Sequence, residues 1–268
     1  MSSDFVKRNS IQKYVDYIKE QSMLGLKTIK EYKTNSYLMI LLDVVTFGVM
    51  MLTYMILMRT LPGIFIWDLY DFFLFYGITL MLWKLMWMHT LRQFNSTLLS
   101  GELNIYRTKP FNVYFLTSSK WINVSFANQI SNIFLYGIIL IIFLTQEYSN
   151  LLLVHILLII GFIYFVAFFV FINSMYFFMK RNDFGRFLHT IEGILYDFTP
   201  RIFENMKLGN ILLLFPAAIS SYFLIEIANN RFDLYLNFLP YAFFVFLFLV
   251  TSIIVMWHFG LKKYEAFG

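Results

Sequence analysis

Acidic side chains interrupt the apolar stretches of the sequence at three positions, Asp43, Glu192 and Asp197. Ionisable groups inside a bilayer are costly, so they usually mark an ion path, a substrate path or a buried pair. Glu192 and Asp197 are five residues apart, and a helix therefore directs them to different faces, where they make a poor proton relay. For Asp43 the pattern favours a pair or a cap within a helical bundle over a transport site.

No catalytic or metal-binding pattern accompanies these acids. The chain has no cysteine, so it offers no thiolate nucleophile and no thiolate metal ligand. Its four histidines are never three or four residues apart, which argues against a helical metal pair. The sequence also lacks a phosphate loop of the form GxxxxGK(S/T) and a GxSxG nucleophile turn. We therefore expect no catalytic residue, no metal site and no cofactor in this chain.

Composition indicates an integral membrane protein. Of the 268 residues, 59% are hydrophobic and only 14% are charged, and the mean hydropathy is +0.66. A soluble domain carries about 25% charged residues, so this chain has too few to cover a water-facing surface. We assign the net charge of +5 to cytosolic flanks that orient the helices and meet anionic lipids. No nucleic-acid partner is expected, because no basic run outside the apolar stretches is interleaved with aromatic residues.

Long apolar stretches predict an all-α fold with six membrane-spanning helices, since a helix of about 20 apolar residues crosses a hydrocarbon core. Lys84, near the end of the second span, is expected to extend its amine towards the membrane surface. A further apolar stretch contains Pro216 and two adjacent serines, which favours a re-entrant helical hairpin over a crossing. The expected spans are residues 37–58, 69–88, 121–145, 151–179, 187–203 and 237–259, with the hairpin at 208–228.

The N-terminal 36 residues are polar and basic, with seven Lys and Arg residues against four acids. This pattern predicts an amphipathic helix that lies in the membrane interface with its lysines in water. The alternative is a helix that packs on a soluble partner. The apolar positions that recur at helical spacing are Ile11, Tyr14, Val15 and Ile18.

The distribution of basic residues predicts the orientation of the chain. With residues 37–268 as the transmembrane domain and both termini cytosolic, sixteen of the 21 Lys and Arg residues lie inside and four lie outside. This arrangement follows the positive-inside tendency. A full crossing at 208–228 would instead place Lys262 and Lys263 outside. We therefore expect a multi-pass plasma-membrane protein with both termini in the cytosol.

Two local patterns resemble those of ABC-2 type permeases, in a branch long catalogued as a domain of unknown function. Residues 99–112, LSGELNIYRTKPFN, are similar to the GELDxxLx(K/R)PxN stretch of that branch, with Asn104 where Asp is usual. Residues 259–268, FGLKKYEAFG, are similar to its closing L(K/R)(K/R)YxSxG, with Ala266 where Ser is common. The six-span order and the basic amphipathic N-terminus also match the branch.

This resemblance implies a half-transporter in which two permease chains form the substrate path and two separate ATPase chains bind ATP and Mg²⁺. Most ABC-2 permeases export their substrates, and aromatic spans would suit an amphiphilic lipid, peptide or drug-like molecule. The cytosolic loop 89–120 is the expected contact with the ATPase, because a glycine and a proline shape its turns and both charge signs are present. The coupling residues expected there are Gly101, Glu102, Leu103, Asn104, Arg107, Lys109 and Pro110.

Two other functions remain open from the residues alone. One is a membrane immunity or scaffold protein that sequesters a toxin without transport. The other is an ion-coupled carrier that uses Asp43 and Glu192. An adjacent ATPase gene would favour the exporter, whereas gradient-driven flux by the isolated chain would favour the carrier.

Overall fold

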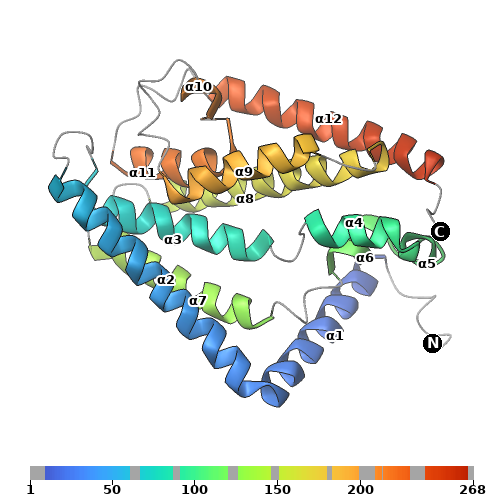
Figure 1. Ribbon diagram of the computed structural model, residues 1–268, viewed down its shortest axis with the longest axis horizontal. Coiled ribbons are helices and arrows are strands. Elements are labelled where there is room, and N and C mark those ends of the chain that lie inside the picture. Colours follow the sequence, from blue (N-terminus) through green and yellow to red (C-terminus); the bar gives the residue numbers. More distant parts are fainter. Residues whose placement is uncertain are drawn as a thin grey trace. The chain divides into compact units, whose positions relative to one another are not determined.

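The computed structural model is helical, and its described residues contain no strand (Figure 1). Three helices are long and apolar enough to cross a membrane: Lys33–Thr60, His155–Phe177 and Phe243–Lys263. These features agree with the expected class, an all-α integral membrane protein. The structure describes residues 10–60, 67–86, 91–119, 126–145, 151–179, 183–198, 209–212, 214–229 and 239–264.

The chain divides into two compact units. The first unit comprises Met1–Asp43, Lys84–Ser131 and Glu265–Gly268, and the second comprises Val44–Trp83 and Asn132–Tyr264. Three of the boundaries between units fall inside helices rather than in connections.

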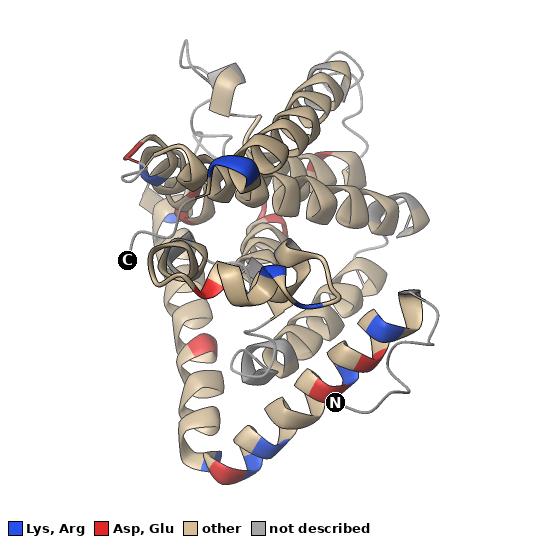
Figure 2. Ribbon diagram, turned by 90° about the vertical axis from the view of Figure 1, so that its right-hand side faces the viewer, with Lys and Arg blue, Asp and Glu red and all other residues tan. Residues whose placement is uncertain are grey.

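The first unit begins with helix α1 (Ser10–Glu31), which carries basic and acidic residues along its length (Figure 2). The apolar stripe expected on this helix is exposed, at Ile11, Val15 and Ile18. Backbone hydrogen bonds continue from α1 into α2 (Lys33–Thr60). Tyr32 N–H donates to a carbonyl oxygen in α1 over 2.9 Å, and a residue in α2 donates to Tyr32 O over 3.1 Å.

The segment expected to be a cytosolic loop is largely helical in the first unit. It forms three short helices that pack on one another, α4 (Leu91–Leu99), α5 (Glu102–Arg107) and α6 (Val113–Ser119). The sequence supplies a small core for them, because Leu98, Leu103 and Leu116 are all buried. The residues expected to contact an ATPase therefore lie in and beside a packed group of short helices and not in an extended loop.

Five of the described helices lie wholly or partly in the second unit and overlap spans expected from the sequence. These helices are α3 (Leu69–Met86), α7 (Phe126–Thr145), α8 (Leu151–Ser174) with the 3₁₀ turn η3 (Met175–Phe177), α9 (Asp183–Asp197) and α12 (Leu239–Lys263). Helix α9 begins four residues before the predicted start of its span. The predicted residues 121–125 and 199–203 lie outside the described residues.

The segment predicted to be a re-entrant hairpin is broken, and its later part is deeply buried in the second unit. It contains α10 (Gly209–Leu212), a π-helical turn (η5, Ala218–Tyr222) and α11 (Phe223–Ala228). Both η5 and α11 contact α8, which also packs along α12. Every residue from 220 to 228 is buried.

Close backbone approach joins α8 to this buried segment at Gly161. A Cβ atom on Gly161 would lie 2.6 Å from the Ser220 Cβ and 2.7 Å from the Ser220 Cα. Two serine hydroxyls donate back along their own helix, from Ser220 to Pro216 O over 2.5 Å and from Ser221 to Ala217 O. These bonds serve carbonyl groups that a π-turn leaves without their usual α-helical donors.

We expect Gly161→Ala to destabilise the protein, because the new methyl group meets backbone that cannot move aside. Overpacking of this kind costs about 1–3 kcal/mol. Gly137→Ala in α7 is the matched control, since nothing lies within 4 Å of its Cβ position and alanine favours a helix over glycine. Thermal unfolding of the two variants in detergent should show a lower midpoint for Gly161→Ala alone. Equal midpoints would contradict the close approach.

Candidate functional site

The expected coupling segment turns at Gly101, which has a φ of 76° and caps the N-terminus of α5. This left-handed backbone favours glycine, so the residue type at position 101 is required by the turn. Asn104 N–H then donates to Gly101 O over 3.1 Å and begins the helix. Glu102 lies in the first turn, where a carboxylate interacts favourably with the helix dipole.

One apolar side chain anchors this segment while its polar side chains face outwards. Leu103 is 0% exposed, whereas Asn104, Arg107, Lys109 and Pro110 are exposed. The Lys109 ammonium lies 5.3 Å from the centroid of the Tyr106 ring. The structure therefore keeps the predicted coupling residues together on one short helix and its two ends, with both charge signs available to a partner.

Four aromatic residues hold α1 against the end of this segment. Tyr14 packs edge-on against Phe111 and Phe115, with ring centroids 5.5 and 4.6 Å apart. Tyr17 lies 5.5 and 5.6 Å from the same two rings. The Asn112 N–H also donates to the Tyr14 hydroxyl over 3.2 Å. We call these four residues the aromatic clamp. Sequence reasoning missed it, because the helical spacing of Tyr14 assigned that residue to the membrane-facing stripe.

Tyr17 is a partly buried member of the aromatic clamp. Burial raises the pKa of its hydroxyl above the usual value, and the nearby Glu20 carboxylate raises it further. A hydrogen bond with Ser119 of α6 acts in the opposite direction. Since an ordinary tyrosine titrates near pH 10, this one remains neutral at physiological pH and its ring packs as an uncharged group.

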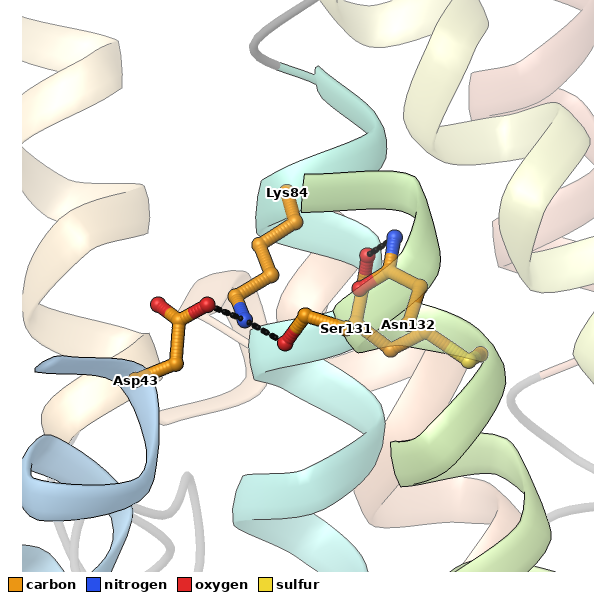
Figure 3. Close-up of polar contacts among 5 residues, drawn as sticks. Asp43, Lys84, Ser131 and Asn132 are labelled. Carbon is orange, nitrogen blue, oxygen red and sulfur yellow. Dashed lines mark hydrogen bonds and ion pairs between the residues drawn. The ribbon is translucent and has the colours of Figure 1, made fainter. Parts of the chain in front are cut away.

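A buried ion pair joins three helices elsewhere in the first unit. Figure 3 shows Lys84 of α3 between Asp43 of α2 and Ser131 of α7. The Lys84 amine pairs with the Asp43 carboxylate and donates to the Ser131 hydroxyl over 2.7 Å. The side chains of Lys84 and Asp43 are 5% and 25% exposed.

The prediction that Lys84 extends to the membrane surface is wrong. Its amine is buried because a carboxylate and a hydroxyl within reach replace the water that it gives up. Asp43 is accordingly held in a pair within the bundle. Sequence spacing carried no signal for this contact, since its members lie about 40 and 47 residues apart.

Glu192 and Asp197 occupy different environments in the second unit, as their spacing on α9 requires. Glu192 is 0% exposed, and its Oε1 accepts a hydrogen bond from Ala217 N–H over 2.8 Å. The Tyr196 hydroxyl lies beside the same carboxylate. Asp197 is exposed at the end of the helix, and its carbonyl oxygen accepts a bond from the Tyr54 hydroxyl over 2.5 Å.

Two further acids are buried in the second unit and were not singled out from the sequence. Glu226 accepts a hydrogen bond from the Trp67 indole over 2.5 Å, and Asp71 accepts one from the Asn229 amide over 2.9 Å. Glu226 could have been recognised in the same way as Asp43, because it is an acid inside an apolar stretch. Asp71 could not, because it lies at the edge of a polar connection in the sequence.

These contacts hold helices together and do not form a catalytic or metal-binding arrangement. Among the described residues, no three His, Cys, Asp or Glu side chains lie together as a metal site would require. Each buried carboxylate is engaged by a lysine, a backbone amide, an indole or a side-chain amide. The arrangement therefore supports a helical framework with an exposed, charged segment available to a partner.

Comparison with known proteins identifies one relationship. The family model described as "ABC-2 family transporter protein" matches residues 43–268. No curated protein and no solved structure matched the chain.

We expect single replacements of the buried ion pair to cost more than replacement of the whole pair. Lys84→Met leaves the Asp43 carboxylate buried without its partner, at a cost of about 3–5 kcal/mol, whereas a pair of apolar residues is often tolerated. A thermal double-mutant cycle with Asp43→Leu measures both effects.

The control is the exposed ion pair between Asp183 and Arg186, whose side chains are 63% and 62% exposed. Exchanging those two charges should change stability by less than about 1 kcal/mol. An additive cycle for Asp43 and Lys84 would mean that the two residues do not act as a pair.

Proposed function

The chain belongs to the ABC-2 transporter family, and we propose that it is the permease subunit of an ATP-driven exporter. The family model covers more than half of the chain, and three described helices can cross a membrane. The sequence contains no phosphate loop, so separate ATPase subunits would bind ATP and Mg²⁺ and supply the energy. ABC-2 permeases generally act with such ATPases.

The helical body formed by α4, α5 and α6 is our candidate for contact with the ATPase, and we call it the coupling body. The observation that carries this proposal is the exposed charge of α5 on a rigid support, with Leu103 buried beneath it. Glu102, Arg107 and Lys109 offer both charge signs, which suits a specific protein surface. An ordinary solvated loop would need neither the buried leucine nor the aromatic clamp.

Helix α1 provides a route from this body to a membrane-spanning helix. The aromatic clamp packs α1 against the start of α6, and hydrogen bonds around Tyr32 carry the backbone from α1 into α2. Helices transmit displacement with little bending over such lengths. Movement of the coupling body on nucleotide binding would therefore shift α2 through contacts that already exist.

We further propose six membrane spans with a re-entrant hairpin at 208–228. Two contacts support this topology: Leu214 O accepts a bond from Tyr164, halfway along α8, whereas Asn229 bonds Asp71 in the first turn of α3. The helix from Leu151 to Tyr164 rises about 20 Å, and the thirteen residues of 216–228 rise by about the same amount. The segment thus has the length to enter from one surface to mid-membrane and return.

A dimer of permease subunits in the plasma membrane completes the proposal. Helices α2 and α12 expose large apolar side chains along their length, among them Leu42, Val49, Phe244 and Phe248. Such faces suit lipid tails and a second permease chain, whether identical or a paralogue. An amphiphilic lipid, peptide or drug-like molecule is the substrate class that we propose. An ion-coupled carrier gains no support, because Asp43 and Glu192 are engaged in structural contacts.

Thiol labelling in intact cells tests the proposed topology on this cysteine-free background. We expect Thr108→Cys and Lys263→Cys to resist an impermeant reagent, because both positions are proposed to be cytosolic. Thr60→Cys, at the outer end of α2, should react. Labelling of Lys263→Cys would mean that 208–228 crosses the membrane and that the chain has seven spans.

Charge reversal tests the coupling contact. We expect Glu102→Lys combined with Arg107→Glu to weaken ATPase binding tens-fold or more, because a partly buried interface charge left unpaired costs about 2–5 kcal/mol. Insertion and folding should survive. Arg59→Glu is the control, since this exposed residue lies at the other end of α2. Co-purification with the ATPase and substrate-stimulated hydrolysis measure the effect, and wild-type levels in the double variant would exclude α5 as the coupling element.

A further inference from the structure

The buried helix that follows Pro216 begins with an incomplete set of hydrogen bonds. Pro216 has no N–H group, and the amides of Ala218 and Ile219 turn back to Phe215 O over 3.0 and 3.1 Å. The first backbone donor that needs an acceptor from elsewhere is Ala217 N–H. At membrane depth no water is present to accept it, and an unpaired buried amide is costly.

Glu192 supplies the missing acceptor from a different helix. Its Oε1 lies 2.8 Å from Ala217 N, and the side chain is 0% exposed. Glu192 therefore acts as an N-terminal cap that α9 provides to the hairpin.

The rest of the hairpin depends on the position of this first turn. The hydroxyls of Ser220 and Ser221 donate to the carbonyl oxygens of Pro216 and Ala217 and so tie the π-turn to it. The π-turn in turn contacts α8 without any intervening side chain at Gly161. A displaced first turn would carry the π-turn away from α8, and π-turns are frequent where helices serve a function.

We propose that Glu192 is a positioning residue that keeps the hairpin at 208–228 seated against α8 and α9 and thereby fixes the outer part of the substrate path. The essential property is the acceptor oxygen at this distance, which glutamine reproduces and leucine does not. This inference rests on the proposed permease function. It gives the acid at position 192 a role that needs neither ion transport nor contact with substrate.

The test uses the full chain in native membranes with its ATPase and a single thiol, Ser221→Cys. Ser221 is 0% exposed and the chain has no other cysteine, so alkylation of the thiol reports release of the hairpin. We expect Glu192→Leu to raise the alkylation rate at least about tenfold, the order expected when one buried donor loses its acceptor. Glu192→Gln should label within about threefold of the parent, because it keeps an oxygen in place.

Leu195→Ala is the matched control on the same helix, since Leu195 is 1% exposed and its truncation weakens packing while Glu192 keeps its acceptor oxygen. It should leave the thiol protected. The proposal is overturned if Glu192→Leu remains protected, or if Leu195→Ala exposes the thiol as strongly. Glu192→Asp serves as a second variant, because it withdraws the oxygen by one methylene and should also expose the thiol; protection there would overturn the distance argument.

The two proposals fail separately in this experiment. Absence of ATPase from the purified parent complex would overturn the permease role while the labelling pattern still reports on Glu192. An unchanged labelling pattern with intact ATPase coupling would overturn the positioning role alone. Substrate-stimulated hydrolysis should fall in Glu192→Leu and persist in Glu192→Gln.

Discussion

Polar groups at membrane depth must find their partners inside the protein, because hydrocarbon offers none. Residues 214–229 of the second unit meet this requirement, in a segment that contains a π-turn and in which most residues are buried. Tyr164 donates to Leu214 O, Glu192 accepts from Ala217 N–H, and the serines of the π-turn serve its first carbonyls. A broken helix is stable here only because neighbouring helices complete its hydrogen bonds.

The same constraint governs the charges of the first unit. A buried ion pair contributes little net stability, but it is costly to break from one side. Lys84 is therefore committed to Asp43 and Ser131, and α2, α3 and α7 are held together at a defined register. This rigidity belongs to the same unit as the helices α4 to α6 and the aromatic clamp.

The sequence predicted structural features that depend on neighbouring residues. It did not predict contacts between residues that are far apart in the chain. The length of the apolar stretches predicts the long helices. The sequence also predicts a turn at Gly101, because a left-handed backbone conformation favours glycine. The pairing of Lys84 with Asp43 could not be predicted in this way, since a lysine near the end of an apolar stretch is compatible with the membrane surface and with a buried ion pair. The helices α4 to α6 were also missed, because each has at most nine residues and their few leucines show no clear period.

The unit boundaries have a mechanical consequence. They fall within α2, α3 and α7, so continuous helix and not flexible loop joins the first unit to the second along the chain. A loop would absorb displacement through its own rotations, whereas a helix resists bending because every turn is hydrogen-bonded.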